Sequence, residues 1–156
     1  MTKGSFYHHF QHFQDYKKHL LSFYEEKGTL QIIENAQQRQ SSLDRLEVIL
    51  QATLRYPSQL EVAIRAWALQ DPFVQAYQQR IDQHRIAYLT EFLFLICHDH
   101  ERARHIGQLF YSIFVGSLHM LPPVQGYELA ALYQEVQKIL DFLPKPADMK
   151  QTKKES

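Results

Sequence analysis

The stretch DPFVQAYQQRIDQHRIAYLTEFLFL, residues 71–95, decides the fold class of this chain. Asp71 followed by Pro72 has the pattern of a helix N-cap and a first-turn proline. Behind this start, side chains recur at three- and four-residue steps, nearly on one helical face: Val74, Tyr77, Ile81, His84, Tyr88, Phe92 and Leu95. The sequence therefore predicts one long helix here.

The segments on either side show the same helical period. Residues 15 to about 38 form a predicted helix that Gly28 weakens, and a serine N-cap opens a second predicted helix that stops at Pro57. The spacing of Ser58 and Glu61 is that of a capping box, which predicts the start of the next short helix. No useful strand-like alternation interrupts the pattern.

Two further helices are predicted in the C-terminal half. Asp99 is the expected cap of a helix that runs to Pro122 and Pro123, and a last helix covers roughly residues 127–143. Glycine and proline are scarce, at 5 and 6 residues, and mark boundaries. The sequence predicts an all-α fold.

Composition bounds the class of protein. The 156 residues suit a single domain, and 45% hydrophobic residues with a net charge of +0 argue against a disordered or strongly charged protein. A local basic patch for nucleic acid is still compatible with this neutrality. The single cysteine, Cys97, excludes an intrachain disulfide, and no apolar run has the length of a membrane span, so we expect a soluble, cytoplasmic protein.

The opening segment TKGSFYHHF, residues 2–10, places three aromatic side chains near the terminus. Thr2 can cap a helix on which Phe6, Tyr7 and Phe10 share one side. A helix this short is not stable alone, and its apolar side needs a platform.

This segment closely resembles the end of the helix-turn-helix in TetR-family repressors, which reads Ser/Thr-Lys-Gly-Ser/Thr-aromatic-Tyr-x-His-Phe. The stretches AIRAWALQDPFVQAYQQRIDQHRIAYL and ARHIGQLFYSIFVGSLHMLPP are similar to the family's middle and dimer-forming helices. The resemblance implies a TetR-like bundle: a recognition-helix remnant in residues 1–14, and an effector-binding and dimerisation domain in 15–143. The polar, charged composition of residues 144–156 predicts a disordered tail.

The resemblance assigns roles to the opening residues. Lys3, Ser5 and His8 are expected to face DNA, and Thr2 and Tyr7 to contact phosphates, as a recognition helix does in the major groove. The chain departs from the family pattern in lacking the two preceding helices, and in having His12 and Phe13 where a phosphate-binding lysine is usual. Met1 stands where the family has an apolar turn residue, so a GTG valine codon read as the start is one explanation.

An effector cavity among the central helices is also implied by the resemblance. The expected wall residues are Trp67, His84, Tyr88, Phe92 and Tyr111. Without the resemblance, the place of His84 in the apolar stripe favours a hydrogen-bonded core histidine over a ligand contact.

A homodimer is expected from the stretch LFYSIFVGSLHML, residues 109–121, which is apolar almost all round and requires burial on two sides. The predicted four-helix interface pairs this helix with the last one. Its expected residues are Phe110, Phe114, Gly116, Leu132, Val136 and Ile139. The alternative is packing within one chain.

Nine histidines raise the question of a metal site, above all in CHDHERARH, residues 97–105. Their spacing matches no zinc motif, so solvated histidines at a helix end are the preferred interpretation, and no metal or cofactor is expected. No phosphate loop, nucleophile elbow or His-Glu-x-x-His motif supports an enzyme. The expected function is a TetR-like regulator, a repressor controlled by a small apolar effector; the alternatives are a dimeric ligand-binding module without DNA binding and, more weakly, a metal-dependent enzyme.

Overall fold

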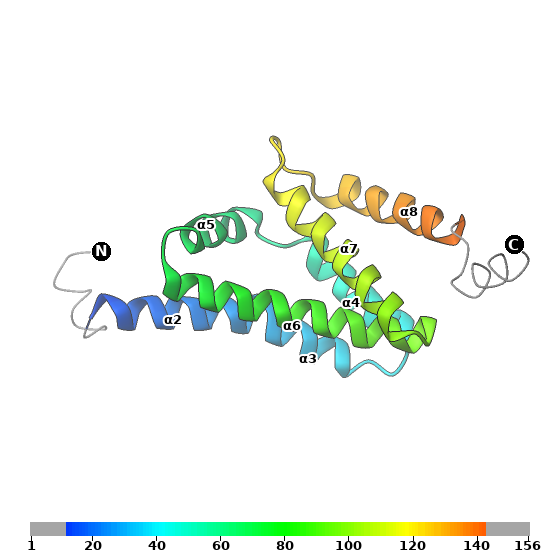
Figure 1. Cartoon of the computed structure of the whole chain (residues 1–156), viewed down its shortest axis with the longest axis horizontal. Coiled ribbons are helices and arrows are strands. Elements are labelled where there is room, and N and C mark those ends of the chain that lie inside the picture. The colour runs from blue at the N-terminus through cyan, green and yellow to red at the C-terminus, as the bar shows by residue number, and fades with distance from the viewer. Residues whose placement is uncertain (1–11, 143–156) are drawn as a thin grey trace, which may run out of the picture.

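The computed structural model describes residues 12–142, and the side chains of all of these except residues 43 and 140–142. Every regular element in this part of the chain is helical (Figure 1). In order they are α2 (Phe13–Glu25), the π-helix η1 (Glu26–Leu30), α3 (Gln31–Gln37), α4 (Ser42–Leu54), α5 (Ser58–Ala68), α6 (Pro72–Cys97), α7 (His100–His119) and α8 (Gly126–Phe142). The prediction of an all-α fold is confirmed.

Three helices begin at the capping residues that the sequence indicated. The side chains of Ser41, Asp71 and Asp99 accept hydrogen bonds from backbone N–H groups in the first turns of α4, α6 and α7. The expected capping box of α5 is wrong, because Pro57 is the N-cap and no side chain caps that helix. Glu61 is instead fully buried and pairs with two arginines.

The predicted helix over residues 15–38 continues through Gly28 as a widened π-turn. The N–H of Gln31 bonds to the carbonyl of Glu26, five residues back. A Cβ atom at Gly28 would stand 2.4 Å from the Tyr56 hydroxyl oxygen, so only glycine fits here without a shift of Tyr56. The π-turn therefore brings the backbone directly against the end of α4.

Helix α2 and η1 lie side by side with α6 and run in the same direction (Figure 1). Side-chain bonds fix this register along the whole contact. Lys17 pairs with Asp71, Glu25 with Arg80, and Thr29 accepts a bond from Arg85, at separations of 54, 55 and 56 residues. These contacts hold the first helix to the centre of the fold.

Two apolar clusters form the core. The first lies between α2, α5 and α6 and contains Leu21, Tyr24, Ile64, Ala68, Val74 and Ile81. The second lies between α7, α8 and their neighbours and contains Tyr111, Phe114, Leu118 and Leu129. Helices α6 and α7 form the largest contact, joined by a short turn at His98 and Asp99, and α8 packs on α4 and α7 (Figure 1).

Within residues 12–142, no helix combines the length and the apolar character needed to cross a membrane. The predicted tail, and nearly all of the predicted recognition-helix remnant, lie outside the described residues.

Candidate functional site: a buried ion network and a cavity beside it

Arg85 is the centre of a buried polar network. Its Nη1 donates to both carboxylate oxygens of Glu61 at 3.1 Å, and its Nη2 donates to the Tyr56 hydroxyl at 3.0 Å and to the Gly28 carbonyl at 3.2 Å. Its Nε donates to Thr29 at 2.9 Å. This one side chain of α6 thus forms hydrogen bonds with η1, with α5 and with Tyr56 at the end of α4.

Arg65 continues the network toward α7. It forms two bonds to the carboxylate of Asp82, at 2.8 and 3.1 Å, in the bidentate geometry that suits a guanidinium. Its Nε donates to Glu61 at 2.8 Å, and it also donates to the Tyr111 hydroxyl at 2.7 Å. Tyr111 in turn donates to Asp82 at 2.7 Å.

The two carboxylates and two guanidiniums balance one another in charge. Burial alone would raise the pKa of Asp82, but the hydrogen bonds from Arg65 and Tyr111 hold it below its ordinary value. Burial first, and then the Glu61 carboxylate, raise the pKa of Tyr24, which donates to Glu61. The phenols of the network therefore stay protonated and donate to its carboxylates, which suits a rigid clamp between helices.

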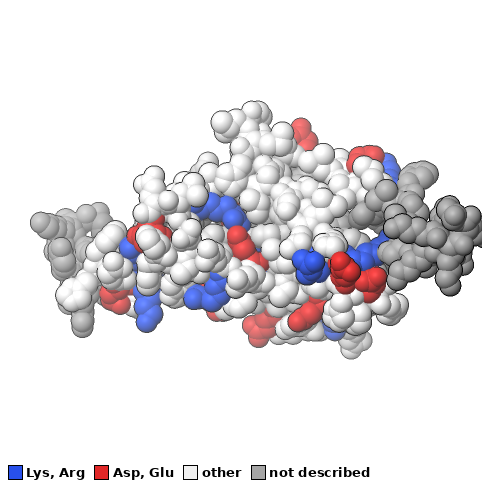
Figure 2. All heavy atoms as spheres, viewed as in Figure 1, with Lys and Arg blue, Asp and Glu red and all other residues white. Residues whose placement is uncertain are grey.

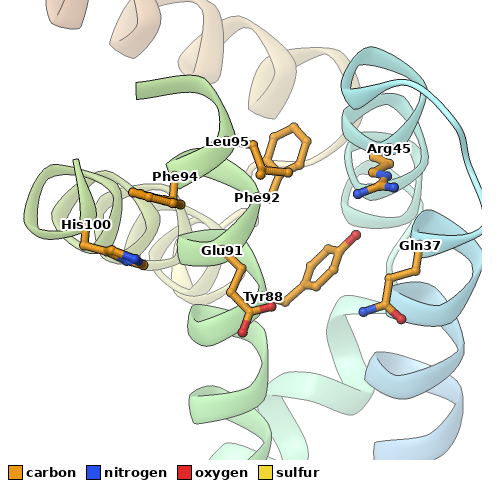
Figure 3. A pocket seen from close by; sticks show the side chains of 8 residues that line it. All are labelled: Gln37, Arg45, Tyr88, Glu91, Phe92, Phe94, Leu95 and His100. Carbon is orange, nitrogen blue, oxygen red and sulfur yellow. The ribbon is translucent and has the colours of Figure 1, made fainter. Parts of the chain in front are cut away.

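A cavity of about 330 Å³ lies farther along α6, between α3, α4 and the start of α7. Its lining is shown in Figure 3 and consists of Gln37, Arg45, Tyr88, Glu91, Phe92, Phe94, Leu95 and His100. Tyr88, Phe92 and Leu95 repeat at helical spacing, so one face of α6 forms a largely apolar wall. The ring of His100 stacks on Phe94 at 3.8 Å between centroids.

The electrostatics of the cavity centre on Tyr88. Partial burial raises the pKa of its hydroxyl; Arg45 on α4 lowers it and Glu91 raises it further. Figure 3 shows Arg45 and Glu91 on opposite sides of the Tyr88 ring. The cavity therefore combines aromatic walls with one positive and one negative group.

Of the five predicted effector residues, Tyr88 and Phe92 line this cavity together. Trp67 packs against the first core cluster, and Tyr111 belongs to the second cluster and to the ion network. The interpretation of His84 as a core histidine is wrong: its side chain is 46% exposed and its Nδ1 lies 3.5 Å from Glu25. The structure thus places the five residues in four separate surroundings.

The predicted dimer residues also divide into two groups. Phe114 is buried in the second core cluster, and Phe110 stacks on Tyr133 with the ring centroids 5.3 Å apart, so both pack within one chain. Gly116 is exposed, Leu132 and Ile139 are 42% and 58% exposed, and Val136 is half-buried. Figure 2 shows an uncharged surface over the C-terminal half of α7.

The DNA-binding residues predicted from the resemblance, Thr2, Lys3, Ser5, Tyr7 and His8, lie outside the described residues. Among those that the structure describes, no three His, Cys, Asp or Glu side chains are placed to hold a metal ion. His98 ends α6 in a left-handed conformation, and His100 begins α7.

Sequence reasoning missed the ion network and the charged residues of the cavity. Arg85 follows Val74, Gln78 and Ile81 at three- and four-residue steps, so it lies within the buried stripe of α6. A charged side chain at such a position signals a buried partner. The sequence gives no such indication for Arg45 and Glu91, because the pattern around each is that of an ordinary solvated position on a helix.

Comparisons of this chain with family models, with curated proteins and with solved structures find no match.

Proposed function

We propose that this protein is a TetR-like transcriptional regulator, a homodimer whose affinity for DNA depends on a small effector. The observation that carries the proposal is the way α2 is fixed to the core. This helix follows directly on the segment that resembles a recognition helix, and Lys17, Glu25 and Thr29 bond it to α6.

The cavity supports an effector-dependent mechanism. Its walls include the last residue of α3 and the C-terminal third of α6, so they lie just beyond the contact of α2 and η1 with α6. A ligand that fits only one arrangement of these helices shifts the population between DNA-competent and incompetent dimers. Effector and operator then change each other's affinity reciprocally.

The exposed apolar residues of α8 support the homodimer. Leu132 and Ile139 are exposed in the single chain, and Figure 2 shows an uncharged surface over the C-terminal half of α7. Two copies that pair α7 and α8 would form a four-helix interface around a two-fold axis. Such symmetry suits the reading of two half-sites on DNA.

The test is electrophoretic retardation after selection from a random DNA duplex library, with this chain and with a version extended by any in-frame upstream codons. We expect the dimer to enrich a palindromic sequence, and Lys3→Ala with Tyr7→Ala to abolish the retardation. Enrichment only by the extended version assigns DNA reading to the longer product. Dimerisation without enrichment by either version would contradict the proposal and favour a ligand-binding module that does not read DNA.

A further inference from the structure

The cavity beside Tyr88 contains two side chains of opposite charge that do not pair with each other. Arg45 uses its Nε to donate to the backbone carbonyl of Arg39 at 3.0 Å. Within residues 12–142, neither Arg45 nor Glu91 forms an ion pair with another side chain. Both line the cavity, so a ligand there would meet both charges.

These two charges are held apart by the fold. Glu91 lies three residues after Tyr88 on α6, and Arg45 extends from the first turns of α4 toward the Tyr88 hydroxyl (Figure 3). A molecule that contacts both groups therefore needs a negative group toward Arg45 and a positive group toward Glu91. This arrangement disfavours a ligand with a single charge, which would face one group of like sign.

The remaining walls suit a flat apolar group. Phe92 is buried, Phe94 and His100 form a stacked pair, and Tyr88 contributes its ring. Aromatic side chains bind another ring in offset or edge-to-face contacts. The volume of about 330 Å³ lies near the lower end of the range for small-molecule sites, roughly 300–1,000 Å³.

We propose that this cavity binds a small aromatic zwitterion, with its ring against Tyr88 and Phe92, its anionic group at Arg45 and its protonated amine at Glu91. The inference rests on the proposed function, in which this cavity holds the effector. A zwitterion supplies a charge-assisted hydrogen bond to each side chain and leaves the cavity neutral overall.

The test is isothermal titration calorimetry of the full chain with three probes that share a phenyl ring and a short carbon chain. L-Phenylalanine carries both charges, 3-phenylpropionate carries only the carboxylate, and phenethylamine carries only the ammonium group. We expect phenylalanine to bind about tenfold or more tightly than either singly charged probe, since each charged hydrogen bond contributes separately.

Variants then assign each charge. Arg45→Gln should reduce the affinity for phenylalanine to about that for phenethylamine, and Glu91→Gln should reduce it to about that for 3-phenylpropionate. The matched controls are Arg55→Gln and Glu47→Gln, exposed charges on or next to α4 that do not line the cavity. Both controls should bind phenylalanine as the unmodified chain does, and circular dichroism should show the same helix content in all variants.

Three results would overturn the proposal: no heat from phenylalanine with the unmodified chain, equal affinity for the three probes, or the same affinity in both cavity variants as in the controls. Calorimetry needs no DNA, so it is independent of the retardation test of the proposed function. Charge-dependent phenylalanine binding without DNA retardation would contradict the regulator and leave the site standing. DNA retardation without phenylalanine binding would remove only this ligand class.

Discussion

Arg85 and Glu61 form a buried ion pair in which one guanidinium nitrogen lies 3.1 Å from each carboxylate oxygen. Glu61 is fully buried, and Arg65 and Tyr24 complete its set of donors. A pair of this kind is stable only while both members are present, because either one alone is an uncompensated charge inside the protein. Loss of either member therefore leaves a buried charge with fewer partners where α5, α6 and η1 meet.

Arg85→Met should lower the free energy of unfolding by about 3–5 kcal/mol, because it leaves Glu61 buried with part of its charge uncompensated. Urea unfolding followed by circular dichroism measures this change. Arg104→Met, at an exposed position of α7, is the matched control and should change stability by less than about 0.5 kcal/mol. Equal effects of the two substitutions would show that the network does not hold the fold together.

Gly28→Ala should destabilise the protein by about 1–3 kcal/mol, because the new methyl group would overlap the Tyr56 hydroxyl. Tyr56→Phe removes that hydroxyl and the bond it accepts from Arg85. In a double-mutant cycle the two substitutions together should cost less than the sum of the single costs. Strict additivity would contradict the close contact between η1 and the end of α4.

Glu25 should make stability depend on pH in the acid range. The hydrogen bonds from Arg80 hold the pKa of Glu25 below its ordinary value of 4.5, although burial opposes this. A carboxylate with a lowered folded pKa contributes stability that is fully present above its unfolded pKa and is lost as pH falls through the folded pKa.

Glu25→Gln should therefore lower stability at about pH 7 by on the order of 1–2 kcal/mol and by less at about pH 3. Urea unfolding of the variant and the unmodified chain at both pH values measures the difference. Glu34→Gln, on the exposed side of α3, is the control, and its stability should differ little from that of the unmodified chain at both pH values. If the stability difference between Glu25→Gln and the unmodified chain is the same or larger at about pH 3 than at about pH 7, the role given to Arg80 is refuted.

Leu132→Glu with Ile139→Glu should convert a dimer into a folded monomer, because both side chains are exposed in the single chain and would lie at the proposed interface. Sedimentation equilibrium gives the mass, and circular dichroism gives the helix content. Leu60→Glu, a similarly exposed leucine on α5, should leave the dimer intact. A monomeric unmodified chain, or a double variant of dimeric mass, would exclude this interface.

Local chemistry made much of the fold predictable. Ser41, Asp71 and Asp99 start their helices as expected, since an N-cap depends only on residues within one turn. Ser58 and Glu61 have the same local pattern, yet Glu61 is used elsewhere because two arginines from distant positions reach it. Tertiary contacts outweighed the local preference at that point.

The candidate sites were less predictable. The period of α6 placed Tyr88 and Phe92 on one face, and the structure brings both into the cavity. The same period wrongly placed His84 in the core, because a stripe of side chains does not show how far the neighbouring helices extend over it. Arg45 and Glu91 line one cavity only because the tertiary structure places α4 and α6 on two sides of it.

The sequence by itself determined the all-helical class, most of the helix ends and the apolar faces, because these depend on neighbours within about one turn. Only the tertiary structure decided the parallel register of α2 with α6, the π-turn at Gly28, the pairing of Arg85 with Glu61 and the two charges in one cavity. Each of these contacts joins residues far apart in the chain. The spacing of apolar residues within one helix does not indicate which other helix will pack against it.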